Sequence, residues 1–123
     1  MAKQKLSVLV VDDNRKFVER INSLLKAVTE IEKIDFAFDF DEARGSLNIQ
    51  VPDVVLLDIN LHGKSGIELL QIIKRSVSDC KVIMITNQVD GYYREQCREL
   101  GADYFLDKTN EFSIIPEIIR SLC

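Results

Sequence analysis

Apolar and polar residues follow one another along the chain in a repeating pattern that is typical of strand and helix units. The apolar run Val54–Leu57 is unbroken, which predicts a strand buried on both faces. After each such run, apolar residues recur every three or four positions, which predicts an amphipathic helix. Five of these pairs with short connections predict a doubly wound α/β domain around a five-stranded parallel sheet. The predicted strands are Leu6–Val11, Ile34–Phe38 (weaker, and placed at an edge), Val54–Leu57, Lys81–Ile85 and Tyr104–Leu106.

The predicted helices have recognisable starts. Polar residues that can cap a helix precede the first three: Asp13 or Asn14, then Asp39 or Asp41, then Ser65. Because each of these side chains can accept a hydrogen bond from a free amide, we expect the helices to begin directly after them.

The fourth and fifth predicted helices differ in how firmly they should be held. The helix over 90–100 has a thin apolar stripe that includes Tyr93 and Cys97, so we expect weak anchoring. Gly101 is expected to end it. In the last helix, Pro116 lacks an amide donor and should start or kink the regular part.

Polar residues with reactive or ion-binding side chains follow the predicted strands. Asp12 and Asp13 come after the first strand and Asp58 after the third, while Thr86 and Lys108 follow the fourth and fifth. The commonest small fold of this kind is flavodoxin-like, with strand order 2-1-3-4-5 and a ligand crevice at the carboxyl ends of strands 1 and 3. We therefore expect all five side chains to meet in one crevice.

Three carboxylates in one crevice call for a cation, because otherwise the pKa of at least one of them would rise. Mg²⁺ prefers carboxylate, water and phosphate oxygens, and with Lys108 it would bring the charge of the site near zero. Such a site suits phosphoryl transfer onto Asp58. The Thr86 hydroxyl is then expected to move toward the new oxygens and Phe105 to fill the space it leaves, which would alter the surface of the fourth helix, fifth strand and fifth helix.

The order of these strand-end residues resembles that of a known family, the receiver domains of two-component response regulators, along essentially the full chain. The matching residues are Asp12, Asp13, Asp58, Thr86 and Lys108, with Gly66 in the loop after Asp58. The resemblance implies a single receiver domain over residues 1–123. It also implies that Asp58 accepts a phosphoryl group from a histidine kinase or phosphotransfer protein, and that the domain acts on a downstream protein target or output domain.

The resemblance further implies roles for individual residues. Mg²⁺ would be bound by Asp13, Asp58 and the backbone carbonyl of Asn60, with Asp12 acting through water. Lys108 and Thr86 would stabilise the phosphoryl group, and Thr86 and Phe105 would form the switch pair. Asn60 and Gln88 would flank the position at which acyl-phosphate hydrolysis is tuned. The chain would be a regulator that catalyses its own phosphorylation and slow dephosphorylation, and not an enzyme with an external substrate.

Three positions depart from the usual pattern of that family. His62 and Thr109 stand where proline is common, and Asn87 replaces a small residue. Because a cis bond to a non-proline residue is costly, we expect a trans Lys108–Thr109 bond and some displacement of Lys108. These departures keep open a degenerate receiver that binds its partner without phosphorylation. An aspartate-nucleophile phosphohydrolase is a further alternative, although Asp12-Asp13-Asn14 lacks the expected DxD spacing.

Composition excludes several classes of function. The net charge of -4 gives no basic surface for nucleic acid, and no apolar stretch approaches the length of a membrane span. We expect no direct nucleic-acid binding, no membrane association and a cytoplasmic location. Cys80, Cys97 and Cys123 have wide spacings and are expected to be reduced thiols.

Overall fold

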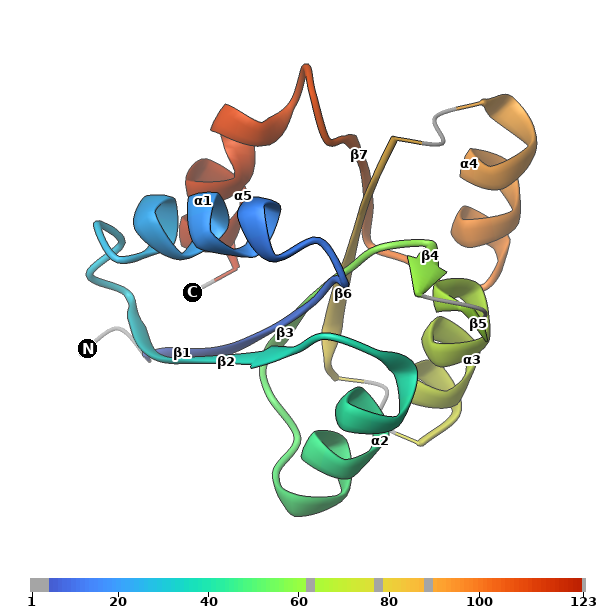
Figure 1. The fold of residues 1–123 in the computed structure, drawn as a ribbon, viewed down its shortest axis with the longest axis horizontal. Coiled ribbons are helices and arrows are strands. Elements are labelled where there is room, and N and C mark those ends of the chain that lie inside the picture. Colours follow the sequence, from blue (N-terminus) through green and yellow to red (C-terminus); the bar gives the residue numbers. More distant parts are fainter. Residues whose placement is uncertain (1–4, 62–63, 77–78, 88–89, 123) are drawn as a thin grey trace.

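Five parallel strands form the central sheet, and their order along it is β2-β1-β3-β6-β7 (Figure 1). The computed structural model describes residues 5–61, 64–76, 79–87 and 90–122. In chain order the strands of the sheet give 2-1-3-4-5, so the predicted flavodoxin-like α/β topology is confirmed. The strands are β1 (Leu6–Val11), β2 (Ile31–Ala37), β3 (Val54–Leu57), β6 (Lys81–Thr86) and β7 (Tyr104–Asp107).

Helices cover both faces of this sheet. Figure 1 shows α1 and α5 on one face and α2, α3 and α4 on the other. The side chains of each strand alternate between two buried apolar clusters: Val8 and Val10 pack with α1 and α5, while Leu9 and Val11 pack with α2 and α3. The helices are α1 (Arg15–Leu25), α2 (Phe40–Ile49), α3 (Gly66–Ser76), α4 (Gly91–Glu99) and α5 (Ile115–Ser121), the last preceded by the 3₁₀ turn η1 (Phe112–Ile114).

The helix starts depend on side-chain caps, as the sequence predicts. Asn14 caps α1 and Asp39 caps α2, which settles the two open choices. Asp90 caps α4, and the Ser65 hydroxyl accepts from the Ile67 amide at the start of α3. Each side chain satisfies an amide that has no partner within its helix.

Some boundaries differ from the predicted ones. β2 runs from 31 to 37 and not from 34 to 38, because it pairs with β1 from Leu6 onward. It lies at the edge of the sheet, as predicted. A two-stranded hairpin of β4 (Asn60–Leu61) and β5 (Lys64–Ser65) was not predicted, because two-residue strands leave no apolar periodicity. His62 and Gly63, between them, lie outside the described residues.

Helix α4 has few buried residues, as its thin apolar stripe predicts. Cys97 is the buried side chain of this helix, whereas Tyr93 is only partly buried and Tyr92 is 72% exposed. Gly101 follows the helix with a φ of 99°, the left-handed conformation in which glycine ends a helix. Cys97 and the partly buried Tyr93 pack this helix against the apolar cluster, and Arg94 adds a hydrogen bond to the Phe105 carbonyl on β7.

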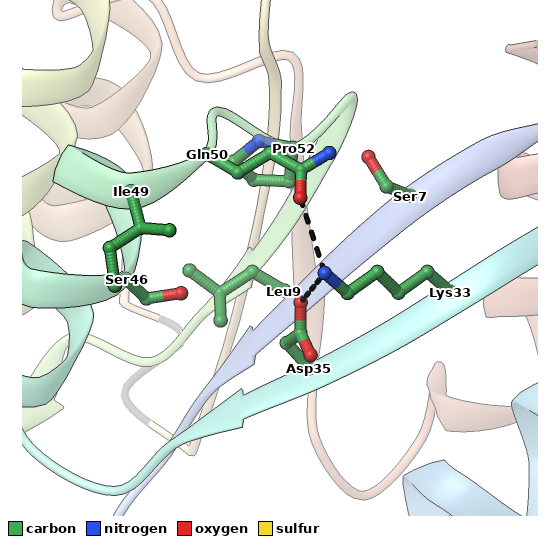
Figure 2. A pocket seen from close by; sticks show the side chains of 8 residues that line it. All are labelled: Ser7, Leu9, Lys33, Asp35, Ser46, Ile49, Gln50 and Pro52. Atoms are coloured by element: carbon green, nitrogen blue, oxygen red, sulfur yellow. Dashed lines mark hydrogen bonds and ion pairs between the residues drawn. The ribbon is translucent and has the colours of Figure 1, made fainter.

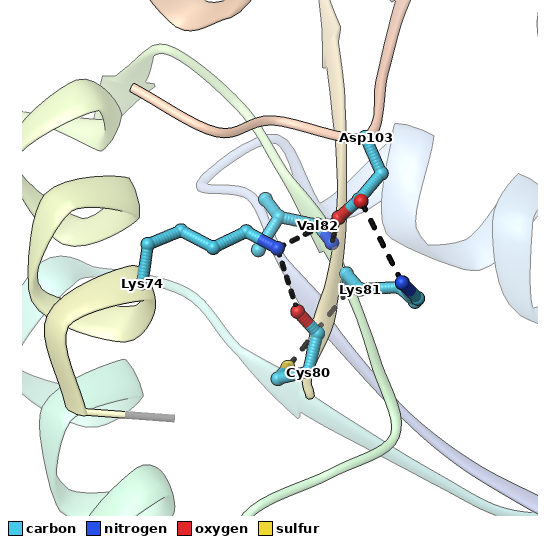
Figure 3. Close-up of polar contacts among 5 residues, drawn as sticks. All are labelled: Lys74, Cys80, Lys81, Val82 and Asp103. Atoms are coloured by element: carbon cyan, nitrogen blue, oxygen red, sulfur yellow. Dashed lines mark hydrogen bonds and ion pairs between the residues drawn. The ribbon is translucent and has the colours of Figure 1, made fainter. Parts of the chain in front are cut away.

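At the edge where the strands begin, a polar cluster ties α3 to β6 and β7 (Figure 3). The Lys74 ammonium donates to the Cys80 carbonyl at 2.9 Å and to Asp103 Oδ2 at 2.8 Å. The same carboxylate oxygen accepts from the Val82 amide at 2.8 Å, and Lys81 lies 3.9 Å from Asp103 Oδ1. We call these residues the amino-end cluster.

A small cavity of about 70 Å³ lies between β1, β2 and the end of α2 (Figure 2). Lys33 extends across it and reaches Gln50 Oε1 at 3.2 Å and Asp35 Oδ2 at 3.5 Å. Its polar wall is therefore largely satisfied by its own residues. Within the described part of the chain, every helix is too short or too polar to cross a membrane.

Candidate functional site

The carboxyl ends of the strands bring the predicted site residues together. The Asp58 amide donates to the Val11 carbonyl at 3.1 Å, which places Asp58 beside Asp12 at the start of the loop. The Lys108 amide donates to the Thr86 carbonyl at 3.0 Å in the same way on the other side. The parallel ladders thus extend one residue past the strands and fix the backbone from which each side chain projects.

Asp12, Asp13, Asp58 and Lys108 form one compact group, which we call the carboxyl-end cluster. The Lys108 ammonium lies 2.7 Å from Asp12 Oδ2 and 3.1 Å from Asp58 Oδ2. One carboxylate oxygen from each of the three aspartates lies within 4.8 Å of the others. The residues predicted from distant parts of the sequence therefore meet.

Three of the four residues of this cluster are buried, Asp13 is partly buried, and the charges of the cluster are not balanced. Asp12 is 1% exposed, Asp58 6% and Lys108 8%. Burial, more than the neighbouring Asp58 charge, raises the pKa of Asp12, although hydrogen bonds from Lys108 and the Asn14 amide oppose the rise. Burial alone would lower the pKa of Lys108, but the Asp12 hydrogen bond and the charges of Asp58 and Asp12 outweigh it, so that pKa is raised. Lys108 is therefore a fixed positive charge at neutral pH.

Lys108 is held in place by more than its carboxylate partners. Its ammonium also lies 4.5 Å from the centre of the Phe17 ring on α1, a cation–π contact. The described backbone contains no cis peptide bond, so the predicted trans bond to Thr109 is confirmed. The Lys108 ammonium reaches Asp58 at 3.1 Å from this trans backbone, and the expected small displacement of Lys108 stays a prediction.

Gly66 is required by a close approach of two backbones. A Cβ atom at this position would lie 1.8 Å from the Asp58 carbonyl oxygen. The Gly66 amide also donates to the Ile59 carbonyl at 2.5 Å, so α3 begins directly against the loop that carries Asp58. The sequence places Gly66 in the loop after Asp58, whereas in the structure it is the first residue of α3 and lies against that loop.

The donor set suits a hard divalent cation. All three aspartates offer carboxylate oxygens, the ligands that Mg²⁺ prefers. Asp12 Oδ2 is buried and, apart from its ion pair with Lys108, makes no aligned hydrogen bond to the described residues. The Asn60 amide lies 3.4 Å from Asp58 Oδ1, which places Asn60 beside the site, and the role of its carbonyl stays a prediction.

The predicted switch pair occupies adjacent strands. Thr86 ends β6 with 1% exposure, and Phe105 lies on β7 opposite Met84. Phe105 is partly buried and packs against the apolar cluster that lies between the sheet and helices α2, α3 and α4. Its ring faces the Arg94 guanidinium, 4.8 Å from the ring centre. Gln88, the other residue predicted to tune hydrolysis, lies outside the described residues, and Asn87 is exposed.

Sequence reasoning missed two residues around the site, Phe17 and Arg94. Phe17 reads as one member of the apolar stripe of α1, and no pattern indicates that its ring also faces Lys108. Arg94 reads as a surface residue of α4. The Phe17–Lys108 contact joins elements that are distant along the chain. The Arg94–Phe105 contact joins two consecutive elements, but neither residue belongs to a pattern that indicates it.

Comparison with known proteins agrees with this geometry. The profile of the response regulator receiver domain matches residues 8–120. LiaR of Bacillus subtilis (strain 168), a transcriptional regulatory protein, is 33% identical over 116 residues, and DltR of Streptococcus agalactiae serotype III is 30% identical over 106. The matches cover 94% and 86% of this chain but 55% and 46% of those proteins, so the chain spans about half the length of these relatives.

Solved structures give the same result. The receiver domain of a DNA-binding response regulator from Colwellia psychrerythraea 34H superposes with a TM-score of 0.89 at 25% identity, covering 96% of this chain and 98% of that one. The receiver domain of NtrX from Brucella abortus superposes with a TM-score of 0.83 at 26% identity, covering 94% and 96%. The fold and the strand-end cluster define a receiver-type α/β protein. The chain belongs to the response regulator receiver domain family.

Proposed function

We propose that this chain is a phosphorylation-dependent switch whose phosphoacceptor is Asp58. The observation that supports this is the carboxyl-end cluster, in which a buried Asp58 lies 3.1 Å from Lys108 and close to the carboxylates of Asp12 and Asp13. A carboxylate beside a fixed cation and a set of oxygen ligands is equipped to receive a phosphoryl group.

In the proposed reaction, an Asp58 carboxylate oxygen attacks the phosphorus of a phosphohistidine on the kinase or phosphotransfer protein. An O–P bond forms, the P–N bond breaks, and its electron pair remains with the imidazole. Lys108 neutralises charge on the transferring oxygens, as its 3.1 Å contact with Asp58 allows. Mg²⁺, held by Asp13, Asp58 and the Asn60 carbonyl with Asp12 acting through water, would supply further charge neutralisation.

The same site is proposed to reverse the signal slowly and without an external substrate. Water attacks the phosphorus of the acyl phosphate, the bond between phosphorus and the Asp58 oxygen breaks, and inorganic phosphate leaves. Asn60 is exposed at the start of β4 next to Asp58, where it can influence the approach of that water, and Gln88 is proposed to act beside it. The chain would thus regulate itself, and not process a metabolite.

The output of the switch is proposed to be the surface formed by α4, β7 and α5. The Thr86 hydroxyl, at the buried end of β6, would bond the new phosphoryl oxygens, and Phe105 on the adjacent strand would turn inward. Because α4 is weakly anchored, a change at β7 can reposition it. Since LiaR and DltR are transcriptional regulatory proteins, a downstream protein target or output domain is proposed to read this surface.

Acetyl phosphate with Mg²⁺ tests the proposal. Intact-protein mass spectrometry should show one added phosphoryl group on the wild type and on Asp41→Asn, which changes an exposed carboxylate. Asp58→Asn should show none. Stoichiometric labelling of Asp58→Asn would refute Asp58 as the phosphoacceptor. If beryllofluoride leaves the affinity for the partner unchanged, the degenerate receiver is favoured instead.

A further inference from the structure

Arg94 makes two contacts to the same residue of β7, the predicted switch residue Phe105. Its Nη1 donates to the Phe105 carbonyl at 3.3 Å, and its guanidinium lies 4.8 Å from the centre of the Phe105 ring. One side chain of the weakly anchored helix α4 therefore holds both the backbone and the ring of Phe105. Strand β7 and helix α4 are joined here by the contacts of Arg94, since few apolar side chains of α4 are buried.

Phe105 lies on the edge strand β7, where it packs against the apolar cluster beneath α2, α3 and α4 and also reaches the surface. Arg94, Arg98, Ala102 and Phe105 are among the residues that line a surface cavity of about 300 Å³ beside α4. Phe105 is partly buried in the wall of this cavity, under the guanidinium. An inward turn of the ring toward Thr86 would withdraw it from Arg94 and lose the cation–π contact.

We propose that Arg94 is a clasp that holds Phe105 in its outward position and so biases the chain toward the unphosphorylated conformation. This rests on the proposed function, because it deepens the switch assigned to Thr86 and Phe105. Arg94 is a positioning residue, which acts on the phosphorylation site only through Phe105. Since a ligand binds more weakly when its preferred conformation is rarely populated, the clasp lowers the apparent affinity for a phosphoryl group or its mimic.

Arg98 offers a matched control one turn further along the same helix. It is exposed like Arg94, but it pairs with Glu95 within α4 and makes no described contact with Phe105. Arg98→Met therefore removes the same charge from the same helix without opening the proposed clasp.

The test is the affinity of the full chain for beryllofluoride in the presence of Mg²⁺, followed by NMR at the Thr86 and Phe105 amides. Arg94→Met should bind about two- to fivefold more tightly than the wild type, as expected for loss of an exposed cation–π contact. Arg94→Lys, which keeps the charge but not the planar guanidinium, should lie between them, and Arg98→Met should match the wild type. Before any beryllofluoride is added, the Phe105 resonance of Arg94→Met should already be shifted toward its bound position.

The outcomes separate this inference from the function on which it rests. If the wild type binds beryllofluoride normally and Arg94→Met binds with equal or weaker affinity, the clasp is wrong and the switch stands. An equal gain in Arg98→Met would also overturn the clasp, because it would trace the effect to net charge. If the wild type does not respond to beryllofluoride and Mg²⁺, the proposed function fails and the clasp falls with it.

Discussion

A lysine–aspartate cluster lies at each end of the strands, one where the strands begin and one where they end. The two clusters are built differently. In the amino-end cluster, Lys74 pairs with Asp103, whose Oδ2 also accepts from the Val82 amide. In the carboxyl-end cluster, Lys108 is the one lysine among three aspartates. The Lys74 and Asp103 side chains are 16% and 24% exposed, whereas Lys108 and Asp12 are 9% and 1% exposed. The carboxyl-end cluster is thus the more deeply buried of the two. It also carries the larger net charge: three aspartates and one lysine give -2, whereas Asp103 with Lys74 and Lys81 gives +1.

This difference separates a structural cluster from a functional one. Short contacts between lysine and carboxylate occur in both clusters, so contact distance does not distinguish a structural cluster from a functional one. At the amino end, each charge has a partner and the carboxylate also satisfies a backbone amide, which closes the cluster to further ligands. At the carboxyl end, excess negative charge is held away from water, which is costly unless a cation binds. An unbalanced buried cluster is therefore the better indicator of a binding site.

The largest effect should come from a substitution that changes no charge at all. Gly66→Ala would place its Cβ 1.8 Å from the Asp58 carbonyl and push apart the backbones that position the carboxyl-end cluster. We expect a loss of about 3 kcal/mol in the free energy of unfolding, at the upper end for overpacking. Gly45→Ala, in α2 with no atom within 4 Å of the new Cβ, is the control and should gain about 0.5–1 kcal/mol. Urea denaturation measures both, and a stable, normally phosphorylated Gly66→Ala would show that this contact can relax.

A second substitution tests whether the amino-end cluster is structural. Asp103→Asn removes the charge that Lys74 faces and weakens a carboxylate bonded to both Lys74 and the Val82 amide. Because the pair is partly exposed, we expect a loss of about 2 kcal/mol, less than for a fully buried pair. Lys81→Met should change stability by less than about 0.5 kcal/mol, since its 3.9 Å contact is exposed. Equal losses of stability in Asp103→Asn and Lys81→Met would mean that the contacts of Asp103 with Lys74 and the Val82 amide do not contribute to stability.

A third prediction uses Cys80, whose carbonyl accepts from Lys74, as a reporter of the amino end. Burial, with smaller contributions from Asp103 and Asp53 and against the effect of Lys74, raises the pKa of the Cys80 thiol to about 11 from its ordinary 9.0. A group with a raised folded-state pKa stabilises the fold below its unfolded-state pKa, and this contribution is lost as pH rises through the folded-state pKa. The wild type should therefore lose about 2 kcal/mol of stability relative to Cys80→Ala between pH 9 and 11. If the unfolding free energies of the wild type and Cys80→Ala change in parallel with pH, burial does not raise the pKa of this thiol.

The convergence of Asp12, Asp58 and Lys108 could be predicted from the sequence, because parallel strands place their carboxyl ends at one edge. Contacts between backbone segments that are distant along the chain could not be predicted in this way. The contact between Gly66 and the Asp58 carbonyl and the hairpin after Asp58 leave no periodic signal. In the sequence Asp103 is a loop aspartate without a visible partner. Its role depends on the pairing of β6 with β7, which brings it beside Val82.

The same limit applies around the site. A trans bond after Lys108 was predicted correctly, but the contact of its ammonium with the Phe17 ring was not, because it joins helix α1 to the residue after β7. The contacts between Arg94 and Phe105 were not predicted either, because the pattern of α4 indicates only that Arg94 is a surface residue.

Apart from the control variants, the smallest effect is expected at Asp58, and it is the most informative about the comparison. Asp58→Asn makes the same isosteric change as Asp103→Asn, in a more buried residue that also bonds a lysine. Without divalent cations we nevertheless expect a change within about 1 kcal/mol, because the substitution relieves crowding among three carboxylates while Lys108 keeps Asp12 at 2.7 Å. Added Mg²⁺ should raise the unfolding free energy of the wild type and much less that of Asp58→Asn, as expected for a ligand that binds only the folded state. If Asp58→Asn instead costs as much as Asp103→Asn and Mg²⁺ stabilises neither protein, both clusters are structural, and the imbalance of charge at the carboxyl end marks no ligand.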